Sequence, residues 1–387
     1  MKLINYPAMA SPPSIEVIDR HVGDRLSPES NVIDPFCGTG RLLFNPREKG
    51  HFVTGIDCSP VAVLTARVGH QKNNIRKIEK SLEEIISHFS SLHYAYKPNK
   101  DEEFWFSEKV YNDVRKLLKS IDKISSTSNV RRFFWLALVT TVRIVSYIRE
   151  DEYKTHRLKP EQRLALSPNV KSIFDDSCRK MIGRILKGNH VRPGGYRVIQ
   201  GDIGSSVSLG KGFDALITSP PYGDSISTVG YGQFARIPLI VLSYSDFFTS
   251  EFDVTTEIGS LDTFCLGGGN CETSESVLLP ESVQYIKKGP MKKFCMDYFY
   301  RLKLVSDCLN EKSLCCFVLA DRTYKQQRFP LIDSTISYME NLGFTLLSKD
   351  ERFLSLKRLP RTMQYINQSK VATHVGMNYE TVVSFIR

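Results

Sequence analysis

The sequence lacks the cysteine and histidine spacings of a zinc site. Its nine cysteines are scattered along the chain, and no two of them form a CxxC pair. An odd number of scattered cysteines indicates reduced thiols rather than a disulfide framework. We therefore expect no metal ion and no disulfide bonds, and we interpret most of the thiols as core or incidental residues.

Long hydrophobic runs are also missing. The first ten residues do not contain the uninterrupted apolar segment of a signal peptide. The most apolar stretch, Phe133 to Val139, is bracketed by arginines and is far shorter than the roughly 20 residues of a membrane span. These absences predict a soluble, cytoplasmic protein that does not bind membranes.

The chain does have an ordinary globular composition and an excess of positive charge. Of its 387 residues, 41% are hydrophobic and 24% are charged, which is enough apolar material for a core. The formal net charge of +10 favours a polyanionic partner without identifying one. The length fits two or three average domains, or one large domain that carries an insertion.

The first third of the chain has the pattern of a nucleotide-binding fold. The apolar run Asn31–Asp34 precedes a tight glycine turn, PFCGTG, at residues 35–40. A second apolar run, Phe52–Ile56, ends at Asp57, and Ser59 then caps a helix. A doubly wound α/β fold opens in this order: strand, glycine turn, helix, strand and acid. Because no GKS or GKT follows, we expect a nucleoside ligand without a triphosphate.

The parallel-sheet pattern stops after this opening and resumes near residue 196. Residues 73–195 have the charged, helical periodicity of an insertion. Further apolar runs predict buried strands, the last two as a closing pair: Tyr196–Gln200, Phe213–Thr218, Leu314–Leu319, Phe344–Ser348 and Thr381–Ile386. We therefore predict one α/β domain, residues 1–72 and 196–387, that is split by a helical insertion.

A stiff aromatic turn follows the run Phe213–Thr218. Residues 218–223 have the sequence TSPPYG. Two adjacent prolines hold φ at about −65° and remove two backbone donors, so they fix the Ser219 hydroxyl and the Tyr222 ring in one arrangement. This suits a binding surface, although a plain strand-to-loop turn would also explain one proline and a glycine.

Together, DPFCGTG at Asp34–Gly40 and TSPPY at Thr218–Tyr222 resemble the amino-methyltransferases of DNA, which use S-adenosylmethionine. The serine-headed SPPY is similar to that of the cytosine-N4-specific enzymes of restriction-modification systems, whereas adenine-N6 enzymes more often carry an aspartate there. The resemblance covers roughly residues 1–70 and 196–387. It implies a Rossmann-like class I methyltransferase fold, with a mostly parallel seven-stranded sheet. The cofactor half comes first here, unlike the common permuted order in which SPPY precedes it.

The resemblance implies a binding site for S-adenosylmethionine at the strand ends. Asp57 would hold the ribose, Cys58 would lie beside the adenine, and Asp202 would take the adenine amino group. The other residues that it places around the cofactor are Tyr6, Asp34, Phe36, Cys37, Gly38, Gly40 and Ile203. For Cys37 we prefer the interpretation of a small residue that fills the turn over a reactive role.

The resemblance assigns the chemistry to Ser219, Pro220, Pro221 and Tyr222. An exocyclic amine is a poor nucleophile because its lone pair is delocalised into the ring. The Ser219 hydroxyl and the Pro220 carbonyl would accept hydrogen bonds from the amine. These bonds would aim the nitrogen lone pair at the sulfonium methyl group, while Tyr222 stacks on the base. The base must first be flipped out of the duplex, which costs a few kcal/mol. The Pro-Cys dipeptide of carbon-5 methyltransferases is absent.

Double-stranded DNA is the expected partner, and two regions are candidates for reading it. The first is the insertion, residues 73–195, and the second is residues 224–289, which we predict to be a long loop. The candidate contacts are Arg131, Arg132, Arg143 and Arg157 in the first region and Tyr231, Gln233 and Arg236 in the second. Alternatively, residues 133–139 are a helix core and the arginines a solvated face.

The leading functional hypothesis is a site-specific DNA cytosine-N4 methyltransferase, the modification enzyme of a restriction-modification system in which a cognate endonuclease acts on the same site. One alternative is a methyltransferase of the same fold that acts on adenine N6 or on RNA, because DPFCGTG also occurs in RNA enzymes. Another is a nucleic-acid-binding subunit that has lost turnover. The intact residues Ser219 to Tyr222 and Asp57 count against that last alternative.

Overall fold

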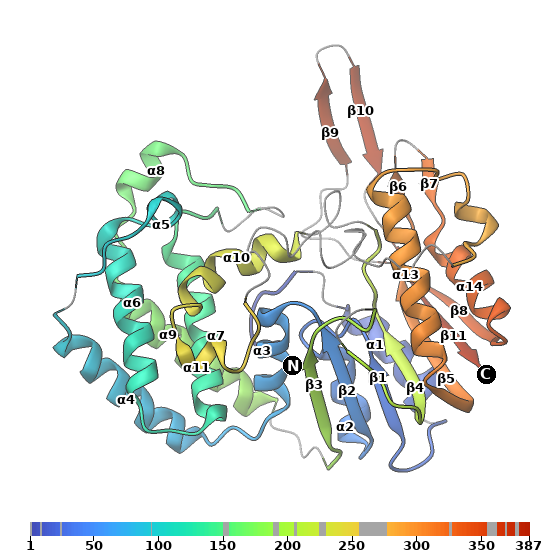
Figure 1. The fold of residues 1–387 in the computed structure, drawn as a ribbon, viewed down its shortest axis with the longest axis horizontal. Helices are drawn as coiled ribbons and strands as arrows, with labels where there is room; N and C mark the ends of the chain where they lie inside the picture. Colours follow the sequence, from blue (N-terminus) through green and yellow to red (C-terminus); the bar gives the residue numbers. More distant parts are fainter. Residues whose placement is uncertain are drawn as a thin grey trace.

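A large sheet with a lobe of helices beside it makes up most of the structure (Figure 1). The computed structural model describes residues 2–7, 10–23, 25–93, 95–149, 155–188, 193–204, 207–223, 230–254, 277–324, 327–353, 362–367, 370–375 and 379–387. The strands of the sheet are β1 (Asn31–Asp34), β2 (Phe52–Asp57), β3 (Tyr196–Gln200), β4 (Phe213–Thr218), β5 (Leu309–Leu319), β8 (Thr345–Phe353) and β11 (Tyr379–Ile386).

The seven strands lie in the order β3-β2-β1-β4-β5-β11-β8. β1 pairs in parallel with β2 and β4, whereas β11 runs antiparallel between β5 and β8. The prediction of a mostly parallel, Rossmann-like class I methyltransferase fold with a closing strand pair is confirmed. The strand order reverses between β1 and β4, and sheets of this kind bind ligands at the carboxyl ends of the strands beside such a reversal.

Alternating side chains of the central strands belong to two separate core layers. In β1, Val32 packs in a cluster with residues of α1 (Pro12–Ile18), whereas Ile33 packs in a cluster with α13 (Pro290–Ser306) and α14 (Leu331–Asn341). Successive side chains of a strand point to opposite faces, so the apolar run of β1 is buried on both. Short helices complete the first layer: η1 (Asp19–Gly23), η2 (Arg41–Leu43) and α2 (Phe44–Glu48).

Helix α3, Pro60–His70, joins the sheet to the helical lobe. Ser59 caps its first turn, because the Ser59 side chain accepts a hydrogen bond from the Ala62 backbone N–H at 3.4 Å. The helix contacts β2 and β3 and also the lobe, and its buried residues share one core cluster with the lobe. The lobe therefore extends the layer of α3 rather than forming a separate core.

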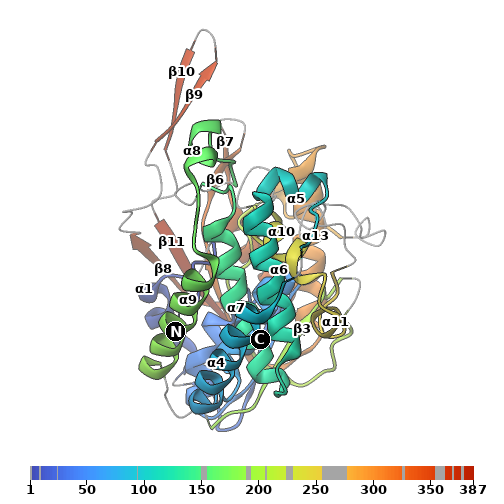
Figure 2. The same cartoon turned by 90° about the vertical axis from the view of Figure 1, so that its left-hand side faces the viewer.

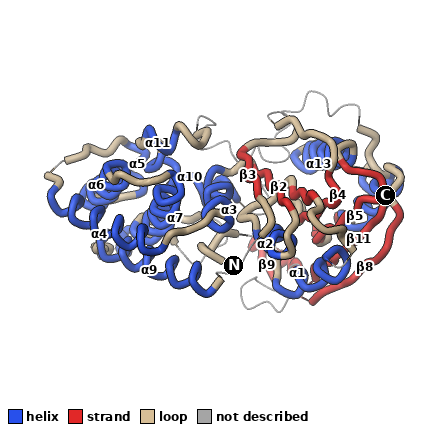
Figure 3. The backbone as a smooth tube through the Cα atoms, turned by 90° about the horizontal axis from the view of Figure 1, so that it is seen from below, coloured by secondary structure: helices blue, strands red, loops and turns tan. Residues whose placement is uncertain are grey.

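The insertion forms the helices of this lobe, which gather on one side of the strands when the molecule is viewed from below (Figure 3). They are α4 (Ile75–Ser91), α5 (Lys100–Trp105), α6 (Glu108–Lys123), α7 (Ser128–Val145), α8 (Pro160–Ala165) and α9 (Val170–Lys187). Helix α7 is central, and its residues 133–139 are at most 1% exposed. That apolar stretch is therefore helix core. Within the described residues, no helix is both long and apolar enough to cross a membrane.

The prediction that residues 224–289 form one long loop is wrong for residues 231–249. Helices α10 (Tyr231–Leu242) and α11 (Asp246–Thr249) occupy this part, and α10 packs against α7. Ala235, Leu239 and Leu242 recur at helical spacing and are buried, so tertiary packing holds the helix despite an internal Pro238. Residues 224–229 and 255–276 of the predicted loop lie outside the described residues.

Two small hairpins were not predicted from the sequence. β6 (Arg322–Tyr324) pairs with β7 (Gln327–Phe329), and β9 (Thr362–Asn367) pairs with β10 (Lys370–Val375). Both views show α8 and the β9–β10 hairpin projecting from the same side of the molecule, beyond the start of α10 (Figures 1 and 2).

An ion-pair triad links the sheet side to the lobe. Glu251, just after α11, accepts a hydrogen bond from Arg67 of α3 at 3.2 Å and also pairs with Arg132 of α7. The three side chains are between 17% and 20% exposed. Glu251 separates two like charges in a mostly buried place. Loss of its carboxylate should therefore lower the free energy of unfolding.

We expect Glu251→Gln to lower the free energy of unfolding by about 2 kcal/mol, because two arginines would then face each other without the carboxylate between them. The control is Asp175→Asn, which breaks the pair of Asp175 with Arg179, a side chain that is 70% exposed. That control should change stability by about 0.5 kcal/mol or less. Urea titration measures both, and equal effects of the two substitutions would contradict the role of the triad.

Candidate functional site

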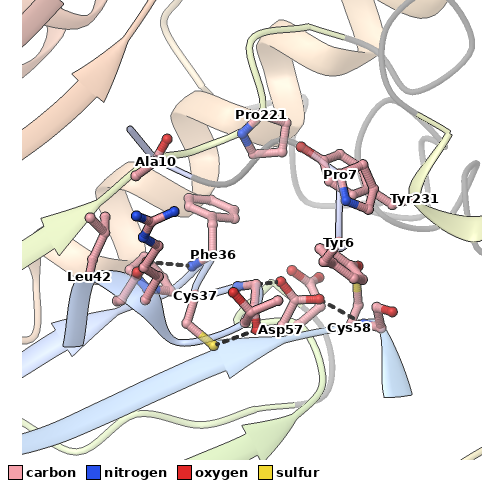
Figure 4. A pocket seen from close by; sticks show the side chains of 18 of the residues that line it. Tyr6, Pro7, Ala10, Phe36, Cys37, Leu42, Asp57, Cys58, Pro221 and Tyr231 are labelled. Carbon is pink, nitrogen blue, oxygen red and sulfur yellow. Dashed lines mark hydrogen bonds between the residues drawn. The ribbon is translucent and has the colours of Figure 1, made fainter. Parts of the chain in front are cut away.

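The carboxyl ends of β1, β2, β3 and β4 surround one open cavity (Figure 4). It encloses about 850 Å³ of space, including the open solvent at its mouth. Ten of the predicted cofactor and catalytic residues line it: Tyr6, Asp34, Phe36, Cys37, Gly38, Asp57, Cys58, Asp202, Ser219 and Pro221. Tyr231, a predicted DNA contact, also lines it. Gly40, Ile203, Pro220 and Tyr222 are not in its lining.

The glycine turn after β1 depends on two residues in left-handed conformation. Gly38 has φ of 51° and Gly40 has φ of 72°. Residues other than glycine rarely adopt such positive φ values. A Cβ at Gly40 would lie 3.0 Å from His70 Nε2 and 3.1 Å from Ala66 Cβ, both on α3. Gly40 therefore serves the packing of the turn on α3. A Cβ at Gly38 would meet nothing within 4 Å, so the backbone there borders open space.

Asp34 joins the two sequence motifs directly. Its Oδ1 accepts hydrogen bonds from Thr218 Oγ1 at 2.7 Å and from the Phe36 backbone N–H at 3.1 Å. The carboxyl end of β1 is thereby tied to the start of TSPPYG on β4. Burial raises the pKa of Asp34 to about 7, because desolvation outweighs both hydrogen bonds and Asp57 adds a nearby negative charge.

Asp57 holds the glycine turn against the end of β2. Its Oδ2 accepts from the Gly38 N–H at 2.9 Å, and its Oδ1 accepts from the Ser59 N–H at 2.8 Å. Burial raises its pKa to about 6, although these two hydrogen bonds act in the opposite direction. The cavity thus contains two carboxyl groups whose pKa values lie close to neutral pH.

Cys37, in the lining of the cavity, has the character of a packing residue. Cys37 is buried, and burial together with the nearby Asp57 and Asp34 raises the pKa of its thiol well above the ordinary range. A Cβ at Gly55 would lie 2.9 Å from Cys37 Sγ, so β2 passes close to this thiol. The thiol form of Cys37 is therefore favoured, which supports the interpretation of a small residue that fills the turn.

Asp202, after β3, is held by an arginine that the sequence analysis did not single out. Arg301 of α13 donates from Nε to Asp202 Oδ1 at 2.6 Å and from Nη2 to Asp202 Oδ2 at 2.8 Å. Arg301 is only 4% exposed, and its Nη1 also donates to the Asp297 carbonyl. This two-pronged pair fixes the orientation of the Asp202 carboxylate at the cavity wall. Ile203 lies behind it, in the core cluster that contains α13.

The residues of SPPY divide between the cavity and the core. Ser219 and Pro221 line the cavity, whereas Tyr222 packs on the core cluster that contains α13. The Tyr222 hydroxyl lies 3.2 Å from Ser219 Oγ. At the mouth, the rings of Tyr6 and Tyr231 stack with centroids 6.2 Å apart, next to Pro7 (Figure 4). Aromatic rings therefore approach the cavity from chain segments that are distant in the sequence.

Two further residues that border the motifs were missed in the sequence. Arg41 follows the glycine turn and lines the cavity, and burial lowers the pKa of its guanidinium. Arg322, after β5, packs so closely on Gly223 that a Cβ there would lie 3.0 Å from Arg322 Cδ. Glycine in TSPPYG is thus explained by this close approach. The position of Arg41 directly after GTG could have identified it in the sequence. No neighbouring sequence feature could have identified Arg322.

The four arginines of the insertion that were predicted to contact DNA make contacts within the protein. The contacts are Arg131 with Ile124 and Phe247, Arg132 with Glu251, Arg143 with Phe234, and Arg157 with Phe104. These guanidinium groups stack on rings or pair within the lobe. Of the α10 candidates, Gln233 accepts from the Thr155 N–H at 3.2 Å, and Arg236 is half-buried. Among the described residues, no cluster of three or more His, Cys, Asp or Glu side chains could hold a metal ion.

Comparison with known proteins finds similarity to methyltransferases. Residues 26–159 match the family described as "Methyltransferase domain". The chain is 26% identical to "Type II methyltransferase M.MvaI" of Kocuria varians, over 98% of this chain and 89% of that protein. It is 33% identical to "Type II methyltransferase M.MjaII" of Methanocaldococcus jannaschii, over 26% of this chain and 16% of that protein. Residues 26–159 are therefore similar to a methyltransferase domain, and nearly the whole chain is similar to a type II methyltransferase.

Among solved structures, the chain resembles a TehB-like SAM-dependent methyltransferase from Corynebacterium glutamicum. The identity is 9% and the TM-score 0.30, over 95% of this chain and 84% of that one. It also resembles the rRNA methyltransferase aviRa from Streptomyces viridochromogenes, with 10% identity and a TM-score of 0.31, over 98% and 86% of the chains. At these scores the likeness does not bear on the function.

The raised pKa of Asp34 predicts a pH-dependent stability. Above its ordinary pKa of 3.8, the unfolded chain releases a proton that the folded protein keeps until pH about 7. The contribution of Asp34 to the free energy of unfolding should therefore fall as the pH rises from 3.8 to about 7. Asn at position 34 can still accept from Thr218 and Phe36 but does not titrate.

We expect Asp34→Asn to gain stability over the wild type between pH 5 and pH 8 by an amount on the order of 2 kcal/mol. Urea titrations of both proteins at the two pH values measure this gain, and comparing the two proteins removes the contribution of groups that they share. A difference in stability that is the same at pH 5 and pH 8 would show that Asp34 is not the titrating group.

Proposed function

We propose that this chain is an S-adenosylmethionine-dependent DNA methyltransferase that transfers a methyl group to the exocyclic N4 amine of a flipped cytosine, as the modification enzyme of a restriction-modification system. The observation that carries the proposal is the hydrogen bond between Asp34 and Thr218, which joins DPFCGTG to TSPPY beside one cavity. The similarity to a type II methyltransferase over 98% of the chain supports the same class of enzyme.

The cavity offers polar groups that suit S-adenosylmethionine. The backbone at Gly38 borders open space, which leaves room for a ligand where a side chain would intrude. Asp57 would accept hydrogen bonds from the ribose hydroxyls, and Asp202 would accept one from the adenine amino group. Arg41 would pair with the methionine carboxylate. Arg301 would keep the Asp202 carboxylate in place. When bound, the cofactor would supply a methyl group on a sulfonium centre.

The chain's own residues would hold and orient the amine. Ser219 Oγ, at the cavity wall, and the Pro220 carbonyl would accept the two N–H groups and draw the nitrogen towards tetrahedral geometry. The two prolines fix these acceptors before substrate arrives, so little entropy is lost in the reaction itself. Tyr222, packed on the core beside them, would present its ring to the flipped base.

Duplex DNA would lie over the mouth of the cavity. Tyr231 begins α10 and lines the cavity, and α8 and the β9–β10 hairpin project from the same side of the molecule (Figure 2). The formal net charge of +10 favours such a partner. Because the four arginines of the lobe contact other residues of the protein, we place the reading of bases at the start of α10 rather than on those arginines.

We expect the purified chain, incubated with unmethylated duplex DNA and methyl-labelled S-adenosylmethionine, to produce N4-methylcytosine. Digestion to nucleosides followed by mass spectrometry identifies the product. N6-methyladenine would overturn the cytosine assignment while keeping the fold and cofactor. Label that appears only when RNA is offered would move the enzyme to another substrate class.

Substitution of the catalytic motif gives a matched control for that assay. Ser219→Ala removes one acceptor for the amine, and the rate should fall by about a hundredfold while cofactor binding persists. Tyr222→Ala should also lower turnover by removing the stacking ring. Full turnover in both variants, at unchanged S-adenosylmethionine affinity, would be incompatible with the assignment of TSPPY.

The pKa of Asp57 predicts how cofactor affinity depends on pH. An ionised carboxylate is the better acceptor for ribose hydroxyls, and burial raises its pKa to about 6. Between pH 7.5 and pH 5 the affinity for S-adenosylmethionine should therefore fall by about tenfold, since roughly a tenth of Asp57 remains ionised at the lower pH. Asp57→Asn should bind more weakly at every pH, with a smaller dependence on pH. Calorimetric titration measures both, and an undiminished pH dependence in the Asn variant would remove Asp57 from the ribose site.

A further inference from the structure

We infer that His70 is a positioning residue of the cofactor site, which holds the Gly40 carbonyl from the side of α3 and so sets how Arg41 enters the cavity. The inference rests on the proposed function, because it concerns the turn that would receive S-adenosylmethionine. His70 is the last residue of α3 and does not line the cavity. No motif in the sequence identified it.

The glycine turn is held by a hydrogen bond from the His70 ring. His70 Nε2 lies 3.1 Å from the Gly40 carbonyl oxygen, and His70 is only 1% exposed. The same oxygen accepts from the Leu43 N–H at 3.2 Å, and a carbonyl has lone pairs for both donors. The peptide that carries this carbonyl continues into Arg41, which lines the cavity. Because that peptide is planar, the direction of its carbonyl determines where the Arg41 side chain begins.

A second contact of the ring indicates which nitrogen carries the proton. His70 Nδ1 lies 3.4 Å from Arg47 Nη1. A guanidinium group can only donate, so Nδ1 accepts, and we assign the proton of the neutral ring to Nε2. The Gly40 carbonyl can only accept, so it requires a donor at Nε2 as well. Both contacts therefore agree on one tautomer, in which His70 donates to the turn.

Aromatic neighbours hold the His70 ring in this orientation. Phe44 stacks on it with ring centroids 4.3 Å apart and an interplanar angle of 14°, and Tyr196 stacks on it with centroids 5.7 Å apart. The Arg47 guanidinium lies 4.4 Å from the Tyr196 centroid and also donates to the His70 carbonyl. A phenylalanine ring could fill the same stack. The nitrogen atoms of His70 therefore serve the polar contacts rather than the packing.

The stack of His70 and Tyr196 also closes the base of the insertion. His70 ends α3 just before residues 73–195, and Tyr196 begins β3 directly after them. Their ring contact brings the two ends of the insertion together beside the glycine turn. Because β3 pairs in parallel with β2, this contact is anchored in the sheet. The donor to Gly40 thus belongs to a rigid part of the fold, as the positioning of a binding site requires.

The sharpest test is His70→Phe, which keeps the aromatic stack and removes the donor to Gly40. We expect its affinity for S-adenosylmethionine, measured by calorimetric titration without DNA, to fall by about tenfold, because Arg41 is held less firmly. His70→Gln places an amide N–H₂ near the position of Nε2 and should recover most of the affinity. At saturating S-adenosylmethionine, the single-turnover methylation rate of His70→Phe on unmethylated duplex DNA should stay within about twofold of the wild-type rate.

His88→Phe is the matched control. His88 lies on α4, which does not line the cavity, and its Nδ1 is 3.1 Å from Ser120 Oγ. This substitution also replaces a hydrogen-bonded histidine by phenylalanine, and it should leave the affinity for S-adenosylmethionine unchanged. Urea titration checks that each variant is folded. If His70→Phe does not fold, His70→Asn takes its place against His70→Gln, because the shorter amide does not reach Gly40.

A double-substitution cycle tests whether His70 acts through Arg41. Arg41→Gln should itself weaken binding of S-adenosylmethionine, because it removes the partner of the methionine carboxylate. Adding His70→Phe to Arg41→Gln should then cost no more than about twofold further. Fully additive losses would overturn the inference. Wild-type affinity in His70→Phe, or a Gln variant that binds as weakly as the Phe variant, would do the same.

The wild-type protein in the same titration separates this failure from that of the proposed function. A wild type that methylates cytosine N4, with His70→Phe binding S-adenosylmethionine equally tightly, overturns only the role of His70. A wild type that methylates adenine or RNA overturns the cytosine assignment, and the affinities of the variants still decide the role of His70. A wild type that does not bind S-adenosylmethionine overturns the proposed function and the role of His70 together.

Discussion

The arrangement of the site depends on one buried hydrogen bond, from Thr218 Oγ1 to the Asp34 carboxyl group. Asp34 is 1% exposed and Thr218 is fully buried, so neither group has water as a substitute partner. The bond holds the carboxyl end of β1 against that of β4, where the strand order reverses. The glycine turn leaves one side of this bond and TSPPYG leaves the other. Parallel strands alone would bring these turns near each other, and the bond fixes how they face.

Charge is distributed unevenly around the cavity. Asp202 has its counter-ion in Arg301, whereas burial raises the pKa values of Asp34 and Asp57 to about 7 and about 6. One wall of the cavity therefore holds an ion pair, whereas the other holds two acids that are poised to ionise when a positive charge arrives. A sulfonium ligand would bring that charge, so its binding and the ionisation of these acids would reinforce each other.

The sequence was most informative where structure is local. Strands that end at Asp34, Asp57 and Thr218 could be predicted because apolar runs and glycine or proline turns have near-neighbour causes. Residues 231–249 were not predicted as helices, since their packing on α7 outweighs the local effect of Pro238. Arg301 was missed for a related reason. Its role comes from Asp202, which is 99 residues away in the chain, and no spacing rule reports such a contact.

The shared core of α3 and the helical lobe has a consequence for how the protein is made. β2 pairs with β3 in parallel, and the whole insertion lies between them in the chain. During synthesis, the lobe emerges before β3 and can already pack on α3, which shortens the distance that the later strand must search. We therefore expect the lobe to act as a folding template that closes a long loop before the sheet is completed. Destabilising it would delay assembly of the cofactor side even though none of the helices α4 to α9 lines the cavity.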